Sequence, residues 1–270
     1  MWRPDVIDLR NFYASHLGQA ARRSIRRQVR LIWPNVVGER VLGLGYATPY
    51  LRPFRDEAER VIAAMPAQQG VVHWPADGLG QVLLSDETDL PFADASIDKV
   101  LVVHGLETAE QVRPMLREVW RVLTSGGTLL VVVPNRRGLW ARSEGSPFGQ
   151  GYPYSPPQLC RLLRDTMFLP GEVRSALYLP PSEKRFFLRA AATWESAGMR
   201  WWQGFSGVIM VEAGKQIYAA KPDRALRRRL RVPDLIPAGA AGMRGGGMAR
   251  DRRNAGSLGD GDRPTARLGR

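Results

Sequence analysis

Short apolar runs of strand length alternate with helical patterns through the middle of this chain, and this alternation most constrains its fold. The runs are Arg40–Leu44, Arg60–Met65, Gln81–Ser85, Asp98–Val103 and Thr128–Val133. The last of them is almost uninterruptedly apolar, which is typical of a strand that is covered on both faces. Strands that alternate with helices form right-handed crossovers, so the pattern predicts an α/β fold with a mostly parallel sheet.

Helical spacing of apolar residues flanks these runs on both sides. A single helix is predicted over residues 10–33, ended by Pro34, and its polar faces carry many arginines. Such a basic amphipathic helix either packs on the domain surface or lies on a membrane. Further helices are predicted over 108–123 (ended by Ser-Gly-Gly at 125–127), 155–166 and 182–204, with last strands over 172–179 and 207–220.

Basic charge is concentrated at the end of the chain. From residue 221 onward there are 13 Lys and Arg residues against 5 Asp, in a chain whose net charge is +13. This Gly-, Ala-, Arg- and Pro-rich composition cannot bury enough apolar surface to fold, so it predicts a disordered basic tail over 221–270. The tail either binds nucleic acid or an acidic surface, or has no binding role. Its lack of aromatic residues disfavours single-strand recognition.

The remaining bulk features exclude several classes of protein. Cys160 is the only cysteine, so no internal disulfide forms and no Cys/His metal cluster exists. A reducing, cytoplasmic setting is the expectation. No run approaches the ~20 apolar residues of a transmembrane helix, and the charged N-terminus lacks a signal core. Residues 1–220 are therefore predicted to form one soluble domain.

Two segments carry a specific resemblance to a known family. They are SDETDLPFADASIDKVLVVHGLE (85–107) and LREVWRVLTSGGTLLVVVPN (116–135). Together they closely resemble the class I S-adenosylmethionine-dependent methyltransferases of the small-molecule type, over roughly residues 38–165. The resemblance implies a Rossmann-like, seven-stranded, mostly parallel sheet, S-adenosylmethionine as cofactor and methyl transfer to an acceptor. It also implies that catalysis rests mainly on orientation.

The resemblance also implies which residues bind the cofactor. Asp86 matches the acid that hydrogen-bonds the adenine amino group, and Glu87 and Thr88 lie beside the ring. A carboxylate at a strand end is well suited to accept a hydrogen bond from an amine. The structural alternative is that Asp86 only caps a turn.

Two positions depart from the family pattern around the first two strands. Where an acid is expected near the end of the first strand the chain has Gly43, and in the following turn Gly45, Tyr46 and Ala47 retain one glycine of three. Where an acid for the ribose hydroxyls is expected after the second strand, the chain has Met65. Loss of a charged hydrogen bond costs roughly 1.5–3 kcal/mol. Gly45 still permits a positive φ and a close backbone approach.

On the acceptor side, His104 follows the fourth strand and is the candidate catalytic base, since histidine titrates near neutrality. A structural histidine is the alternative reading. Aromatic residues between 140 and 154 either cover the acceptor pocket or pack as a loop. The leading hypothesis is methyl transfer to an unidentified small-molecule acceptor. The rival is a non-catalytic, pseudo-methyltransferase binding or regulatory protein that kept the fold and lost the donor.

Overall fold

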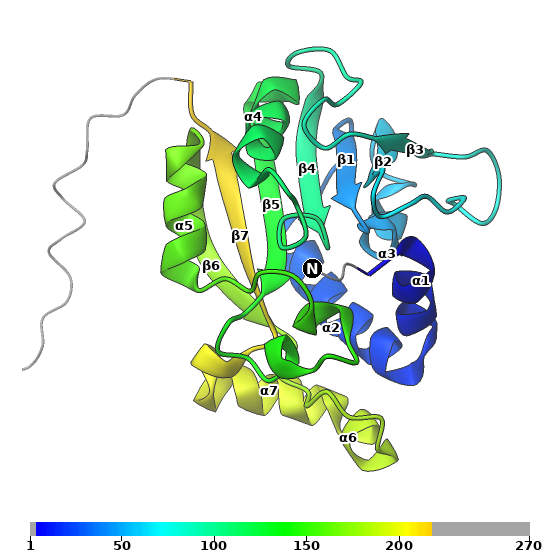
Figure 1. The fold of residues 1–270 in the computed structure, drawn as a ribbon, viewed down its shortest axis with the longest axis vertical. Helices are drawn as coiled ribbons and strands as arrows, with labels where there is room; N and C mark the ends of the chain where they lie inside the picture. Colours follow the sequence, from blue (N-terminus) through cyan, green and yellow to red (C-terminus); the bar gives the residue numbers. More distant parts are fainter. Residues whose placement is uncertain (1–3, 218–270) are drawn as a thin grey trace, which may run out of the picture. The chain divides into compact units, whose positions relative to one another are not determined.

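A seven-stranded sheet with the order β3-β2-β1-β4-β5-β7-β6 forms the centre of the computed structural model, which describes residues 4–217 (Figure 1). The strands are β1 (Arg40–Gly45), β2 (Arg60–Pro66), β3 (Val82–Ser85), β4 (Ile97–Val103), β5 (Leu123–Pro134), β6 (Phe168–Ala176) and β7 (Val208–Lys215). The first five are parallel to one another, and β7 is antiparallel to both β5 and β6. The predicted α/β fold with a seven-stranded, mostly parallel sheet is confirmed.

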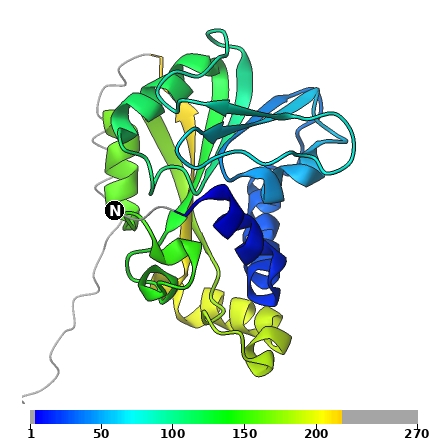
Figure 2. The same ribbon diagram turned by 45° about the vertical axis from the view of Figure 1, so that its right-hand side comes forward.

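Helices cover both faces of the sheet, as Figure 2 shows. One face packs against α1 (Val6–Ala14) and α2 (His16–Ile32), and the other packs against α4 (Val112–Val122) and α5 (Pro156–Asp165). Successive residues of β4 alternate between the two: Leu101 and Val103 join the α1–α2 core, while Val102 joins the α4–α5 core. This is the period-two alternation of a strand that is buried on both faces.

The remaining helical segments, apart from the 11-residue α7, are short. They are α3 (Thr48–Leu51), η1 (Arg52–Phe54), η2 (Trp140–Arg142), η3 (Pro147–Gly149), α6 (Arg185–Arg189), α7 (Ala191–Trp201) and η4 (Gln203–Phe205). In Figure 1, α6 and α7 lie at the end of the sheet toward which β1 and β4 point.

Two predicted strands, over 128–133 and 172–179, begin earlier in the structure, as β5 and β6, and three predicted helices also differ. The helix predicted over 10–33 is two helices, because Ser15 is extended and caps α2 by accepting from the Gly18 amide. The helix over 108–123 ends before its Ser-Gly-Gly signal, because Leu123 already pairs with Ile97 in the sheet. The helix over 182–204 divides into α6 and α7 at Ala190. The predicted tail over 221–270 lies outside the described residues.

Candidate functional site

Ligands of doubly wound sheets bind at the carboxyl ends of the parallel strands, next to the switch in strand order. Here that place lies between β1 and β4. The turn that leaves β1 depends on Gly45, whose φ is +82° and whose added Cβ would lie 2.4 Å from the Val103 carbonyl oxygen. The next amide, that of Tyr46, donates to the same carbonyl at 2.8 Å. Glycine is therefore required at position 45 to hold the turn against the end of β4.

Gly43 has a different role from Gly45. A Cβ at this position would lie 2.5 Å from a methyl group of Leu51 and 2.8 Å from the Ala47 methyl group. The space that a side chain at 43 would enter is thus already filled by apolar atoms of the β1–α3 turn. The packing of this turn disfavours an acid at position 43, because a carboxylate side chain would need both Leu51 and Ala47 to move.

Helix α1 lies across the strand ends and fills the space above them. Its Leu9 and Tyr13 are buried in the same apolar cluster as Met65, which ends β2 and is itself fully buried. The Tyr13 ring stacks on the Tyr46 ring at 5.7 Å between centroids. The Val6 amide donates to the Gln69 carbonyl at 2.8 Å, which fixes the start of the helix to the loop after β2.

A buried chain of polar groups joins α1 to the end of β4. The Tyr13 hydroxyl lies 2.8 Å from the Tyr50 hydroxyl and 2.7 Å from Nε2 of His104, while His104 Nδ1 lies 3.2 Å from Glu107 Oε1. With a neutral His104, these contacts are satisfied when His104 Nδ1 donates to the carboxylate, Tyr13 donates to Nε2, and Tyr50 donates to Tyr13. Burial raises the pKa of the Tyr13 hydroxyl well above its ordinary value, so Tyr13 stays protonated.

His104 itself is held in an unusual conformation. Its φ is +51°, in the left-handed region that non-glycine residues rarely adopt, and its side chain is almost completely buried. Glu107 is equally buried, and within residues 4–217 its Oε2 has no hydrogen-bond partner. A backbone strained in this way, beside a buried histidine–carboxylate pair, is typical of a functional site.

The loop after β3 carries Asp86, Glu87 and Thr88. Asp86 Oδ1 accepts from the Thr88 amide and hydroxyl, each at 2.8 Å, and these bonds lower the pKa of this exposed carboxyl. Both partners lie within the same turn, so the structure shows Asp86 closing that turn. Glu87 is buried beside the end of β2.

The motif in α4 explains why this loop has a fixed position. Glu118 accepts from the Leu90 amide at 3.0 Å, and Arg121 donates to the carbonyls of Leu90 and Phe92, each at 2.9 Å. Arg121 also pairs with Glu118 and Asp94. Within segment 116–135, Glu118 and Arg121 therefore hold the β3–β4 loop in place through hydrogen bonds to its backbone.

With α1 in place, the cavity beside the end of β2 and the loop after β3 is small. The cavity lined by Pro66, Glu87, Gly105 and Thr108 measures about 10 Å³, which is room for a single water molecule. Pockets for small molecules generally measure roughly 300–1,000 Å³. This cavity is thus too small for S-adenosylmethionine in this conformation, in which Leu9 and Tyr13 of α1 pack in one apolar cluster with Tyr46 and Met65.

The aromatic segment expected near the acceptor is largely packed. Trp140 and Phe148 are buried, and the Trp140 indole donates to the Leu179 carbonyl at 2.6 Å. Phe148 contacts the His104 ring at 4.9 Å between centroids. Tyr152 is exposed. The packed-loop alternative therefore holds for Trp140 and Phe148.

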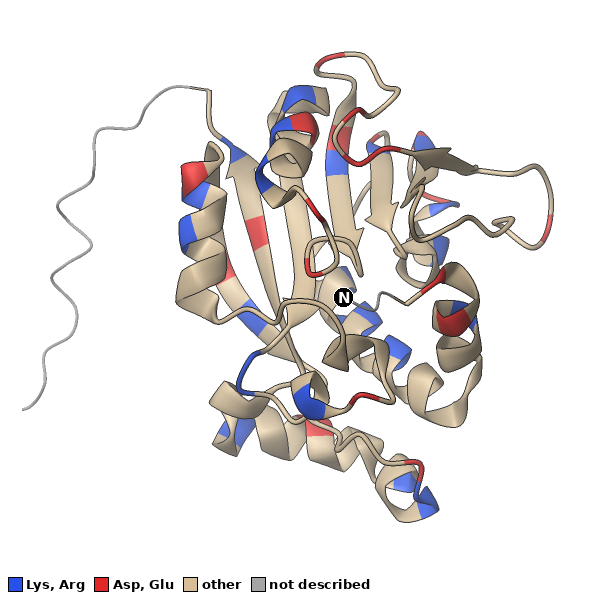
Figure 3. Ribbon diagram, in the orientation of Figure 1, with Lys and Arg blue, Asp and Glu red and all other residues tan. Residues whose placement is uncertain are grey.

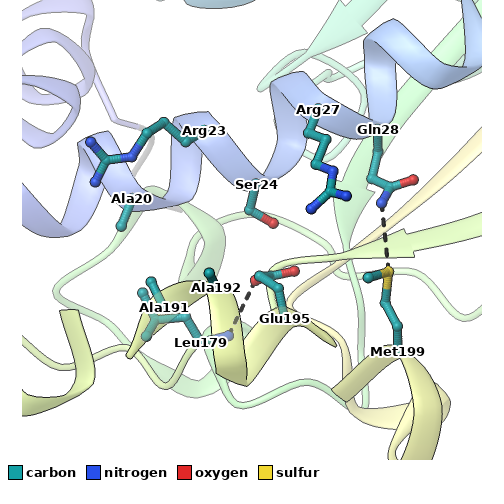
Figure 4. Close-up of a pocket in the computed structure, with 10 residues that line it drawn as sticks. All are labelled: Ala20, Arg23, Ser24, Arg27, Gln28, Leu179, Ala191, Ala192, Glu195 and Met199. Atoms are coloured by element: carbon teal, nitrogen blue, oxygen red, sulfur yellow. Dashed lines mark hydrogen bonds between the residues drawn. The ribbon is translucent and has the colours of Figure 1, made fainter. Parts of the chain in front are cut away.

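A separate groove of about 200 Å³ lies between α2 and α7 (Figure 4). Ala20 and Ala192 give it apolar walls, and Arg23 and Arg27 lie along its α2 side (Figure 4). Glu195 accepts from the backbone amides of Leu177, Tyr178 and Leu179 and so fixes α7 to the chain after β6. The Glu195 carboxylate is thus engaged in holding the fold.

Two further features are absent from residues 4–217. No group of three or more His, Cys, Asp or Glu side chains has the arrangement of a metal site. No described helix combines the length and the apolar character that crossing a bilayer requires.

Comparisons of the sequence and of the structure with known proteins both find methyltransferases. Residues 42–131 match the methyltransferase domain family. The chain is 27% identical over 207 residues to the ubiquinone/menaquinone biosynthesis C-methyltransferase UbiE of Rubrivivax gelatinosus, covering 73% of this chain and 78% of the relative. It is 32% identical over 97 residues to a demethylmenaquinone methyltransferase of Porphyromonas gingivalis, covering 36% of each protein. A SAM-dependent methyltransferase structure from Thermotoga maritima superposes with a TM-score of 0.54 at 18% identity, covering 78% of this chain and 96% of that one.

Proposed function

Because the chain belongs to the class I S-adenosylmethionine-dependent methyltransferases, we propose that it methylates a small aromatic acceptor of the quinol type. The chain is a methyl-transferring enzyme by family and fold, and its cofactor is S-adenosylmethionine, which supplies an activated methyl group. The observation that carries the proposal is the strand order 3-2-1-4-5-7-6 with the Gly45 turn and His104 at adjacent strand ends. The acceptor class is supported by the two relatives, whose names both concern quinone biosynthesis.

We propose that the cofactor reaches the strand ends after α1 has moved away. Tyr46 and Ala47 would then line the turn after β1, and Met65 would offer an apolar surface at the end of β2. Asp86, Glu87 and Thr88 would lie at the adenine end. The proposal is supported by the small number of polar contacts that hold α1 at its inner face: the Val6 amide bond and the two bonds of the Tyr13 hydroxyl.

We propose that His104 accepts a proton from the acceptor. When a methyl group replaces a hydrogen on a phenolic ring, one proton leaves, and a base near neutrality assists that loss. With Tyr13 withdrawn, Nε2 of His104 has its lone pair free, while Glu107 holds the proton on Nδ1. Glu107 is thus a positioning residue for His104, and sequence inspection gave it no role.

The filled strand ends also favour a second candidate, a non-catalytic binding protein in which α1 has permanently replaced the cofactor. Calorimetric titration of the full chain with S-adenosylmethionine and S-adenosylhomocysteine distinguishes the two. We expect saturable micromolar binding and, in a separate assay with a short-chain naphthoquinol as acceptor, formation of S-adenosylhomocysteine together with the methylated naphthoquinol. A folded protein that binds neither compound up to millimolar concentration would refute methyl transfer and support the second candidate.

A further inference from the structure

Five arginines line one cleft on the outer side of the β1–α3 turn. Arg10 comes from α1, Arg22 and Arg26 from α2, and Arg52 and Arg55 from η1 and the residue after it. The cleft measures about 350 Å³, within the range of small-molecule sites. Blue Lys and Arg positions recur along α2 in Figure 3. No signal in the sequence predicted this convergence, because it joins three segments that are separate in the sequence, around Arg10, Arg22 and Arg52.

These positive charges are largely uncompensated. The only acidic residue that lines the cleft is the exposed Asp77, which pairs with Arg55 at 3.5 Å. Within residues 4–217 no carboxylate pairs with the other four arginines. By contrast Arg30, on another face of α2, forms a two-bond pair with Glu57. Clustered like charges repel one another, so an unpaired cluster of this kind favours an anionic ligand.

The pKa of Tyr46, which lines the cleft, responds to two of these arginines. Burial raises the pKa of the Tyr46 hydroxyl, and the positive charges of Arg10 and Arg22 oppose the rise. Both guanidinium groups are therefore close enough to influence the Tyr46 hydroxyl. Trp74 forms the opposite wall, with the Arg55 guanidinium 5.8 Å from its ring centroid.

The number and kind of cations indicate the ligand. Guanidinium groups bind phosphate oxygens through paired, charge-assisted hydrogen bonds. A single carboxylate engages one or two arginines, and five need a ligand with several negative oxygens. S-adenosylmethionine does not meet this requirement, because its sulfonium and ammonium groups are positive. We propose that this cleft binds a small anion that carries two or more phosphate groups, such as a diphosphate ester.

Helix α2 provides a matched control for this proposal. Arg22 and Arg26 lie one turn apart and line the cleft, whereas Arg23 and Arg27, also one turn apart, line the groove shared with α7. The variants Arg22→Gln/Arg26→Gln and Arg23→Gln/Arg27→Gln remove equal charge from the same helix. Arginine and glutamine have similar helix propensities, so both variants should retain the helix.

The experiment is calorimetric titration of the full chain with pyrophosphate, with ADP and with a short single-stranded RNA at low ionic strength. We expect saturable binding of pyrophosphate, weakened about tenfold or more by Arg22→Gln/Arg26→Gln and less than about threefold by Arg23→Gln/Arg27→Gln. ADP binding tighter than pyrophosphate would show that Trp74 or Tyr46 contacts the organic part. Arg52→Gln, at an exposed position, provides a second variant if the double variant unfolds.

Three results would overturn the proposal. They are absence of saturable pyrophosphate and ADP binding in a folded sample, equal weakening by both double variants, and binding of RNA alone. The first two would make the cluster a feature of general surface charge. Because the test measures anion binding and not methyl transfer, its failure would leave the proposed enzymatic function untouched.

Discussion

Replacing Tyr13 by phenylalanine should open the strand ends to the methyl donor. The Tyr13 hydroxyl makes two buried hydrogen bonds, to Tyr50 and to His104 Nε2, at 2.8 and 2.7 Å. Each contributes about 1 kcal/mol, and leaving a buried partner unsatisfied costs about 1–3 kcal/mol. We call the conformation in which α1 covers the strand ends the closed state. The substitution should destabilise this state by about 2–3 kcal/mol relative to the open one, while it retains the ring that packs on Tyr46.

The closed state competes with cofactor binding, so the apparent affinity depends on the open fraction. A loss of about 2–3 kcal/mol in closure corresponds to a gain of roughly 30- to 150-fold in affinity when the closed state dominates. Calorimetry with S-adenosylhomocysteine measures that gain, and hydrogen exchange at the amides of residues 6–14 measures opening of α1. Leu163→Ala is the control, because it leaves a cavity under α5, away from α1. Faster exchange in α1 with unchanged or weaker cofactor affinity in Tyr13→Phe would refute the reasoning.

Four other predictions rest on separate parts of the structure. Asp86→Ala should weaken S-adenosylhomocysteine binding about tenfold without lowering the melting temperature greatly, since the carboxylate is exposed; calorimetry and thermal unfolding test both halves. Met65→Asp should destabilise the fold by about 3 kcal/mol or more in urea unfolding, because it buries an unpaired charge. Arg40 lowers the pKa of Asp98 below its ordinary value of 3.8, so this pair stabilises the fold above about pH 4 and loses its effect as the pH falls further; Asp98→Asn should flatten the acid limb of stability measured by chemical denaturation. Pyrophosphate should weaken S-adenosylhomocysteine binding in calorimetry, and Arg22→Gln/Arg26→Gln should abolish that effect.

The sheet was predictable because its strands are short, apolar and bounded by polar turns. A run such as 128–133 contains no polar side chain after Thr128, so burial on both faces follows from composition alone. Element boundaries were less predictable where pairing overrides local signals. Gly126 and Gly127 normally end a helix, yet here they lie within β5, because Leu123 already pairs with Ile97 and the register then shifts by a bulge.

The sequence predicted where in the fold the candidate site lies, but not which side chains pack around it. Strand ends identified Tyr46, Asp86 and His104, since the carboxyl ends of parallel strands meet at one edge of the sheet. The apolar spacing over 10–33 predicted a helix that packs on the domain or on a membrane, but it gave no role to Tyr13. Its partners lie 37 and 91 residues away in the sequence. Contacts over such separations depend on how the whole domain packs, which a local pattern does not encode.

Helix α1 contributes to both candidate sites, and this links them energetically. Tyr13 fills the strand ends and also lines the arginine cleft, to which α1 adds Arg10. An anion held between Arg10 and the α2 arginines would fasten α1 to α2 in the closed position. On the proposal that the methyl donor binds only after α1 has moved away, the two ligands would oppose each other, and thermodynamic linkage would require each to weaken the other by the same factor. A phosphorylated anion would therefore act as an inhibitor of methyl-donor binding from a cleft that Asp86 does not line.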